Sequence, residues 1–327
     1  MIRLNNLKTF ELHVLRMCVV HSRVGDKRLI SEDYRTTKAG FAGEDKVSRF
    51  LGEVVLTGKM DTYRNVVMDN TQMDIIVVTP KMVCILEVKN MRGEFYFDSL
   101  SKQFYRVIDG VKKEGMRNPE LQLQRAVRVL QRNLTLRGVH IPVQGLIVFA
   151  SRSGIVIQPP TLFHSVPIDA MCDTIEEMES VSSELMTNEE LKKVRHILKR
   201  GTFTVHDEGL MERLGIERKE IRPGVKCGKC FTVGMKRVYS TWVCGTCGCQ
   251  DKEAHIATLQ EYQLLFGSET TSRDVKWWLG IDDKYLTSRL LKKCIEKYSG
   301  SDKNRIYTLK FEPWRLESFL AFEMRKR

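Results

Sequence analysis

The sequence contains no apolar run that approaches the roughly 18 residues of a membrane-spanning helix. Residues 1–8 have no apolar core of the length of a signal peptide, and Arg16 interrupts the next apolar run, from Val14 to Val20. A long basic amphipathic helix, of the kind that lies on a membrane surface, is also missing. We therefore expect a cytoplasmic protein that has no membrane partner.

Internal repeats and low-complexity segments are absent as well, which leaves a chain of ordinary globular domains. With 327 residues, 42% of them hydrophobic, the chain is long enough for about two or three domains with their own cores. Nine cysteines, four of them in a metal-binding pattern, fit a reducing compartment. Lys and Arg number 53 against 41 Asp and Glu, and this net charge of +12 favours nucleic acid as a partner.

The most informative segment runs from Asp74 to Lys89, where two apolar strands flank a turn at Pro80-Lys81. A tight turn there pairs residues whose numbers add to 161, so that Asp74 faces Glu87 across the hairpin. Lys89 lies two residues beyond Glu87 and therefore on the same face of its strand. Because Pro80-Lys81 is not an ideal hairpin turn, a bulge or a one-residue slip is the alternative register.

Two carboxylates and an ammonium group at the end of a buried hairpin are costly unless they hold a metal ion or a substrate. Carboxylate oxygens are the ligands that Mg²⁺ prefers, and Mg²⁺ polarises a phosphoryl oxygen and lowers the pKa of water. A lysine beside it can position the water or stabilise charge on the phosphate. Asp74, Glu87 and Lys89 therefore predict a site for phosphodiester hydrolysis. A solvated Glu87–Lys89 pair at a strand end is the alternative.

Two predicted helices add polar residues to this candidate site. Gly40 to Glu44 opens an amphipathic helix, so Glu44 in its first turn is either a further metal ligand or a partner of the helix dipole. Asn118 and Pro119 begin the second helix as N-cap and first helical residue. On one side of that helix lie Gln122, which acts at the site or only caps its helix, and two candidate nucleic-acid contacts, Arg125 and Arg128.

These motifs, in this order and spacing, resemble the nuclease-related domain, NERD, which is similar to the PD-(D/E)xK restriction-endonuclease-like superfamily. The matching motifs are Gly43-Glu44, Gln72-Met-Asp74, Glu87-Val-Lys89-Asn90, Gly93 and Asn118-Pro-x-x-Gln122. The resemblance covers residues 37–155 and implies an α/β fold with a mixed sheet flanked by helices. It also implies that Glu44, Asp74 and Glu87 hold Mg²⁺ or Mn²⁺, and that Lys89 and Gln122 act on water or phosphate. The Trp that often precedes the Asn-Pro motif is absent, and Phe104-Tyr105 lies where an aromatic residue is wanted.

A second motif consists of two Cys-x-x-Cys pairs. Their members are Cys227, Cys230, Cys244 and Cys247. Four thiolates at this spacing predict a closed, structural Zn²⁺ site, and the strand-like residues between the pairs resemble a zinc ribbon. The alternatives are a pair of disulfides, Cys249 in place of Cys247, and His255 as a ligand.

Residues 256–312 form a third element, which resembles a winged helix-turn-helix. Helices are predicted over 257–266, 271–279 and 283–294, and a strand over 305–311. Thr271 and Asp274 form a capping box, and Gly280 ends that helix. The expected DNA contacts are Thr287, Ser288, Arg289, Lys292 and Lys293 on the recognition helix and Lys303, Asn304 and Arg305 near the wing.

Both C-terminal modules allow other interpretations. Basic residues of the ribbon (Lys226, Lys229, Lys236 and Arg237) around Tyr239 and Trp242 suit a nucleic-acid contact, but a protein contact or a structural spacer is an alternative. Winged helices also dock onto proteins, and we expect Trp277-Trp278 in the core rather than on a binding surface.

The sequence therefore predicts five parts. These are an N-terminal extension (1–36), a nuclease-like domain (37–155), a partly helical connector that can pack on it (156–225), a zinc ribbon (226–255) and a winged-helix-like α+β module (256–327). The predicted function is a metal-dependent deoxyribonuclease that the C-terminal modules target, with a homodimer as one way to cut both strands. The alternatives are a catalytically silent nucleic-acid-binding regulator and a protein-docking adaptor.

Overall fold

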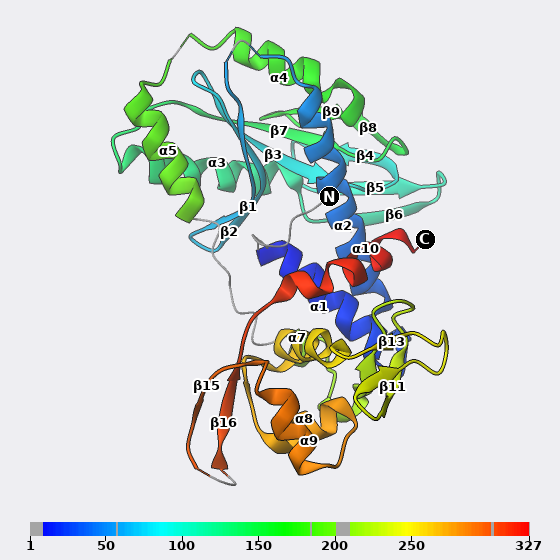
Figure 1. Cartoon of the computed structure of the whole chain (residues 1–327). Helices are drawn as coiled ribbons and strands as arrows, with labels where there is room; N and C mark the ends of the chain where they lie inside the picture. Colours follow the sequence, from blue (N-terminus) through cyan, green and yellow to red (C-terminus); the bar gives the residue numbers. More distant parts are fainter. Residues whose placement is uncertain (1–8, 57, 184, 201–209, 302–303, 327) are drawn as a thin grey trace. The chain divides into compact units, whose positions relative to one another are not determined.

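The computed structural model describes residues 9–56, 58–183, 185–200, 210–301 and 304–326. They form two compact units, one with the residues up to Thr37 and from Val205 onward, the other with Lys38–Thr204 (Figure 1). Within the described ranges, no helix is both long enough and apolar enough to cross a membrane. Residues 1–8 and the predicted wing residue Lys303 lie outside the described residues.

The unit Lys38–Thr204 is built on a five-stranded sheet in the order β1-β2-β3-β7-β9. The strands are β1 (Asp61–Met68), β2 (Thr71–Val78), β3 (Val83–Lys89), β7 (Val143–Phe149) and β9 (His164–Pro167). β1, β2 and β3 are antiparallel neighbours, whereas β7 runs parallel to β3 and to β9. β2, β3 and β7 bury apolar residues on both faces, as strands do when helices cover a sheet on both sides.

Helices cover the two faces of this sheet with separate apolar clusters. On one face, α3 (Pro119–Thr135) packs Leu123 and Leu130 against Ile85 of β3. On the other, α2 (Ser31–Phe50) and α4 (Met171–Ser180) contribute Val47 and Met171 to a cluster that contains Leu86. The predicted fold class, a mixed sheet flanked by helices, is confirmed.

The predicted hairpin register is confirmed where the strands pair. Four successive pairs, from Ile75 opposite Leu86 to Val78 opposite Val83, have numbers that add to 161. Thr79 and Met82 exchange backbone hydrogen bonds around the turn, and the Thr79 hydroxyl accepts from the backbone N–H groups of Lys81 and Met82. This side chain stabilises a turn whose residue types are not ideal for a hairpin.

The predicted start of α2 is wrong. The helix begins at Ser31 rather than near Gly40, so Glu44 lies well inside it. Residues 31–39 contain no Gly or Pro that would stop the helix from extending backwards. The start of α3 is as predicted: Pro119 is its first residue, and the Asn118 side chain accepts a hydrogen bond from the backbone N–H of Glu120.

A second, four-stranded sheet has the order β6-β5-β4-β8. Its strands are β4 (Gly93–Phe97), β5 (Phe104–Ile108), β6 (Lys112–Met116) and β8 (Gly154–Gln158). Phe95 stacks on Phe104, and its ring also contacts Phe149 in a tilted arrangement. Gly93 opens β4 with φ 113°, and a Cβ there would lie 2.8 Å from the Val107 carbonyl oxygen, so only glycine fits this position.

Residues of the predicted connector continue the unit Lys38–Thr204. β9 extends the main sheet beside β7, η4 (Ile168–Ala170) and α4 follow it, and α5 (Asn188–Arg200) lies close to α3 and β1. The residues of the predicted connector are partly helical, as expected. The five-part division of the chain remains a prediction.

The other unit combines the two ends of the chain. α1 (Thr9–Arg23) packs against α7 (Ala254–Phe266) and α10 (Glu317–Arg325), so the predicted N-terminal extension belongs to the same compact unit as the C-terminal residues. Short helical turns complete it: η2 (Lys27–Ile30), α6 (Leu210–Arg213), η5 (Arg218–Glu220) and η7 (Pro313–Leu316).

Two small sheets belong to this unit. The first contains β10 (Val225–Lys226), β11 (Val233–Val238), β12 (Thr241–Val243) and β13 (Gln250–Asp251). The second contains β14 (Glu269–Thr270), β16 (Ile306–Leu309) and β15 (Ile295–Ser299), with α8 (Ser272–Leu279) and α9 (Lys284–Leu291) between β14 and β15 in the chain. The capping box of Thr271 with Asp274 is confirmed, and Gly280 ends α8 in the left-handed conformation.

A buried ionic cluster joins α1, β10 and α7. The Arg23 Nε donates to Glu261 Oε2 at 2.6 Å, and the Lys226 Nζ lies 2.5 Å from Glu261 Oε1. All three side chains are at most 5% exposed. Burial lowers the pKa of Lys226 to about 8, although the Glu261 charge opposes the shift. One carboxylate is therefore the shared counter-charge of two buried cations.

Replacing Glu261 with glutamine is expected to destabilise this unit by about 3–5 kcal/mol, because Arg23 and Lys226 would remain buried without a counter-charge. The free energy of unfolding from urea denaturation measures the effect. Asp26→Asn, which removes one partner of the exposed Arg28–Asp26 pair, is the matched control and should leave the unfolding midpoint unchanged. Equal midpoints for Glu261→Gln and the parent protein would contradict the expectation.

Candidate active site and cysteine cluster

The end of β3 brings three predicted site residues into direct contact. The Lys89 Nζ lies 2.6 Å from Glu87 Oε1 and donates to Gln122 Oε1 at 3.1 Å. Glu87 is buried, and the Lys89 side chain is 19% exposed. The ammonium group is therefore oriented by two oxygens from two different elements, β3 and α3. This arrangement differs from the alternative of a solvated pair, because the site is largely closed to water.

Asp74 reaches the same strand through its side chain. Its Oδ2 accepts a hydrogen bond of 2.9 Å from the backbone N–H of Val88, between Glu87 and Lys89. The ladder of β2 with β3 has its last pair at Ile75 and Leu86, so this side-chain bond continues the contact between the strands. Burial and the nearby charge of Glu87 raise the pKa of Asp74 to about 7, and the Lys89 charge opposes the shift.

Glu44 belongs to a polar network that the sequence did not reveal. The Asn65 Nδ2 donates to Glu44 Oε2 at 3.0 Å, and the Gln72 Nε2 donates to Asn65 Oδ1 at 2.9 Å. Asn65 is buried within β1 and has φ 52°, a left-handed conformation in the middle of a strand. Burial, followed by the Asp74 charge, raises the pKa of Glu44 well above its usual range. An asparagine inside an otherwise regular strand was the signal that could have found it.

Gly43 explains why the helix that carries Glu44 can lie close to the end of β3. A Cβ at Gly43 would lie 2.5 Å from the Asn90 Cβ, closer than real side chains approach. The Asn90 Nδ2 donates to the Ala39 carbonyl oxygen at 2.8 Å and so fixes this approach of α2 to β3. Because Glu44 lies in the middle of α2, its interpretation as a partner of the helix N-terminus is wrong.

The chemistry of this donor set fits a divalent cation. Glu44, Asp74 and Glu87 supply the carboxylate oxygens that Mg²⁺ and Mn²⁺ prefer. Burial, followed by repulsion between neighbouring carboxylates, raises the pKa values of Glu44 and Asp74, and a bound cation would relieve that repulsion. In the described part of the chain, the three carboxylates do not have oxygens all within 4.8 Å of one another. A single ion held by all three therefore requires at least one of these side chains to move.

The family comparison agrees with this geometry. The model of the NERD family, described as a nuclease-related domain, matches residues 39–150. Residues 39–150 form a nuclease-related domain. The predicted resemblance is thereby confirmed. Neither a curated protein nor a solved structure matches the chain.

Outside the nuclease-related domain, four sulfur atoms come together. Cys227, Cys230, Cys244 and Cys247 have Sγ atoms all within 4.8 Å of one another. The Cys227–Cys247 and Cys230–Cys244 sulfur distances are 3.7 and 3.5 Å. Tetrahedral zinc with bonds of about 2.3 Å places its sulfur ligands roughly 3.8 Å apart, so the cluster fits zinc and a zinc ribbon.

The other candidate ligands, Cys249 and His255, lie outside this group of sulfur atoms. All four cysteines of the group are free thiols. The His255 Nδ1 instead accepts a hydrogen bond from the Trp242 Nε1 at 3.3 Å, and burial lowers the pKa of His255 to about 4. His255 is therefore a neutral core residue of the ribbon region.

Two ribbon residues that the sequence suggested as nucleic-acid contacts are buried. The Lys226 ammonium is paired with the Glu261 carboxylate. The Trp242 ring lies beneath the Arg237 guanidinium and is 1% exposed. Alternation along β12 directs Trp242 inward, whereas both residues of β10, Val225 and Lys226, are buried. Lys229, Lys236 and Tyr239 are exposed.

The predicted nucleic-acid contacts are largely on the surface. Arg125, Arg128, Arg289, Lys292 and Lys293 are exposed, and Arg305 is half-buried over the Tyr298 ring. α9 ends at Leu291, so the predicted helix to Cys294 is wrong and Lys292 and Lys293 follow the helix. Thr287 is 1% exposed and donates to the Asp283 carbonyl oxygen, which removes it from the expected contacts. Trp278 is a core residue, as expected, whereas Trp277 is half-buried beneath the Arg218 guanidinium.

Proposed function

We propose that the nuclease-related domain hydrolyses phosphodiester bonds in nucleic acid, with DNA as the expected substrate and Mg²⁺ or Mn²⁺ as cofactor. The observation that carries this proposal is the Lys89 ammonium, held between Glu87 and Gln122 beside Asp74 in a largely buried site. Phosphoryl transfer requires positive charge and hydrogen-bond donors aimed at a phosphate, together with acidic groups that hold a metal. The nuclease-related family supports the same chemistry.

In this proposal, Asp74 and Glu87 hold the cation, and Glu44 provides a third carboxylate. Mg²⁺, when bound, neutralises charge on the phosphate and lowers the pKa of water. Lys89 donates to a phosphate oxygen or to the attacking water and so stabilises the charge that develops. Gln122 keeps the ammonium group in position, and the Asn65–Gln72 bond orients the amide that contacts Glu44.

The other unit is proposed to bring the nucleic acid to this site. Its α7-β14-α8-α9-β15-β16 order supports a winged helix, with α9 as the proposed recognition helix. Arg289 on α9, Lys292 and Lys293 after it, and Arg305 before β16 are the proposed contacts. Zinc held by the four-cysteine cluster would support the neighbouring ribbon. Four of the nine cysteines of the chain follow a metal-binding pattern, which supports a reducing compartment, and the cytoplasm is the proposed location.

The test is cleavage of a panel of labelled single- and double-stranded DNA and RNA by the purified full-length protein, with Mg²⁺, Mn²⁺ or EDTA. We expect cleavage that needs the metal and is lost in Glu87→Ala, because that variant removes both a proposed ligand and the partner of Lys89. Glu189→Gln, on the exposed side of α5, is the control and should cleave normally. Cleavage by Glu87→Ala at the parent rate would contradict the proposal.

One observation favours a second candidate function. Lys89 pairs with Glu87, Asn65 donates to Glu44, and the Val88 backbone N–H donates to Asp74, so all three carboxylates already have partners within the protein. A nucleic-acid-binding regulator with a silent nuclease fold would keep such an arrangement. It predicts salt-sensitive binding to nucleic acid without cleavage in either metal, which the same panel detects.

A further inference from the structure

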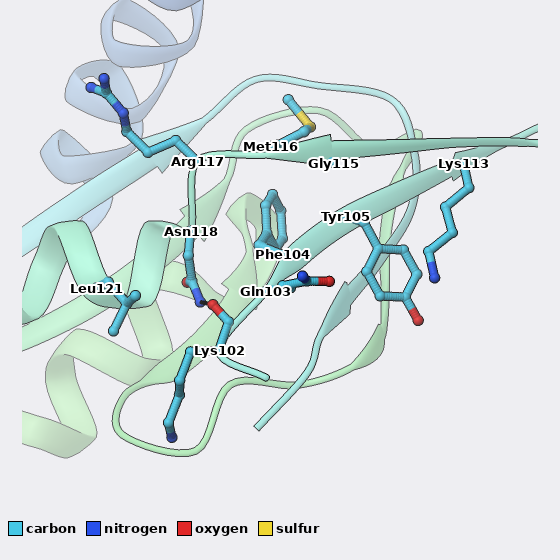
Figure 2. A pocket seen from close by; sticks show the side chains of 10 residues that line it. All are labelled: Lys102, Gln103, Phe104, Tyr105, Lys113, Gly115, Met116, Arg117, Asn118 and Leu121. Atoms are coloured by element: carbon cyan, nitrogen blue, oxygen red, sulfur yellow. Dashed lines mark hydrogen bonds between the residues drawn. The ribbon is translucent and has the colours of Figure 1, made fainter. Parts of the chain in front are cut away.

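The nuclease-related domain contains a pocket that the proposed chemistry does not use. It has a volume of about 720 Å³ and lies between β5, β6 and the start of α3 (Figure 2). Asn118 and Leu121 form the α3 side of the pocket. Gln122, which contacts Lys89, is the next residue of that helix. The pocket and the candidate active site therefore share the first turn of α3.

The pocket carries positive charge and no acidic lining residue. Lys102, Lys113 and Arg117 line it, and in Figure 2 their cationic ends lie on different sides. All three are exposed, and none forms an ion pair with an acidic side chain in the described part of the chain. In contrast, the neighbouring cationic residues Arg106 and Lys112 both form ion pairs with Glu114. Asp98, whose pKa Lys113 helps to lower, is already held by backbone N–H groups of Leu100 and Ser101.

The aromatic ring of Tyr105 lines one side of this pocket. Tyr105 stacks on Tyr96 at 5.1 Å between ring centroids, with 6° between the planes. On the other neighbouring strand the residue opposite Tyr105 is Gly115, which has no side chain, and a Cβ built there would meet no atom within 4 Å. The glycine therefore leaves open space beside the ring. The Lys113 Nζ lies over the Tyr105 ring, 3.7 Å from its centroid, at the end of a flexible side chain.

We propose that this pocket binds a single-stranded segment of the nucleic acid on which the nuclease-related domain acts, an inference that rests on the proposed function. An unpaired base would stack on Tyr105 in the space that Gly115 leaves, with the flexible Lys113 side chain moved from the ring to a phosphate. Three cations on separate sides suit a backbone that carries a phosphate at every nucleotide. A phosphopeptide brings a single phosphate and leaves two of the cations without partners. A base-paired duplex cannot offer the face of a base to Tyr105.

The test is binding of a labelled 20-nucleotide single-stranded DNA, the same sequence as RNA, and the matching duplex to the full-length protein in EDTA. Gly115→Val fills the space beside Tyr105 without changing the charge, and valine suits a strand. We expect it to weaken single-strand binding about tenfold and to leave duplex binding unchanged. Equal thermal midpoints for the variant and the parent will show that the fold is kept.

A matched charge pair on β6 gives a second measurement. Lys113→Gln should weaken single-strand binding and make the plot of log affinity against log salt less steep by about 0.7. Lys112→Gln removes the same charge from the adjacent residue, which pairs with Glu114 and does not line the pocket, and should keep the parent slope. Photocrosslinking of an iodouracil oligonucleotide should label the peptide that contains Tyr105.

These results distinguish failure of the proposed binding pocket from failure of the proposed hydrolysis. Loss of single-strand binding in Gly115→Val supports the pocket even where the parent protein cleaves nothing. Parent affinity in both Gly115→Val and Lys113→Gln overturns the pocket, and leaves the proposed hydrolysis standing where the parent cleaves. Equal losses for duplex and single strand, or competition by a phosphopeptide at the same concentration as the oligonucleotide, also overturn it.

Discussion

Lys89→Met will lower the rate of nucleic-acid cleavage by on the order of 10²- to 10³-fold, as the loss of one preorganised donor does in other active sites. The methionine keeps the aliphatic volume of the side chain but removes the ammonium group that lies between Glu87 and Gln122. Because that group is 19% exposed, water cannot readily replace it. The measurement is single-turnover cleavage with saturating protein, which separates chemistry from binding.

Gln122→Ala should have a smaller effect than Lys89→Met, because it removes the orientation of the ammonium group but not its charge. Lys192→Met, on the exposed side of α5, is the matched control for loss of one positive charge. Nucleic-acid affinity measured in EDTA should stay near the parent value for Lys89→Met. Cleavage by Lys89→Met at the parent rate would remove Lys89 from the mechanism and favour the silent regulator.

Removal of zinc will unfold the four-stranded sheet around the cysteine cluster. This sheet consists of short strands, two of them only two residues long, and it buries few large side chains of its own. Structural zinc sites contribute about 10–16 kcal/mol of apparent binding free energy in small peptides, which exceeds what such a sheet can gain from packing. We therefore expect one zinc per chain by elemental analysis, and loss of protected amides in β10–β13 when a chelator is added.

Cys227→Ser is the variant that tests this site, and Cys249→Ser is its matched control. Cys227 belongs to the sulfur cluster, whereas Cys249 lies two residues beyond Cys247 and outside the cluster. Cys249→Ser should keep its zinc and its hydrogen-exchange protection, while Cys227→Ser should lose both. Full zinc content in Cys227→Ser would show that the cluster is not the metal site. The nuclease-related domain should remain folded in both variants, since it lies in the other unit.

Local rules were enough for the parts of the protein whose residues are close in the sequence. The hairpin register follows from one turn and from alternation along two strands, and four observed pairs agree with it. The caps at Asn118 and Thr271 follow from side chains that satisfy the first N–H groups of a helix. Each of these features depends on contacts within about a dozen residues, where backbone geometry leaves few choices.

Helix ends were less predictable where no residue marks them. α2 continues backwards to Ser31, and α9 stops before Lys292, although neither limit has a strong sequence signal. The helix start changes the role of Glu44, which moves from a first turn to a helix interior. Packing of a whole helix decides such limits, because propensities differ by only a few tenths of a kcal/mol per residue.

The sequence by itself determined the residues of the candidate site, the hairpin that carries three of them, and the four cysteines of the proposed zinc site. Only the tertiary structure decided that Gln122 contacts Lys89, that Asn65 holds Glu44, and that α1 packs against α7. It also decided that Lys226 and Trp242 are buried, and that Gly115 leaves space beside Tyr105. These contacts join residues on different strands and helices. They depend on how sheets and helices pack, and periodicity along one segment carries no information about its neighbour across the core.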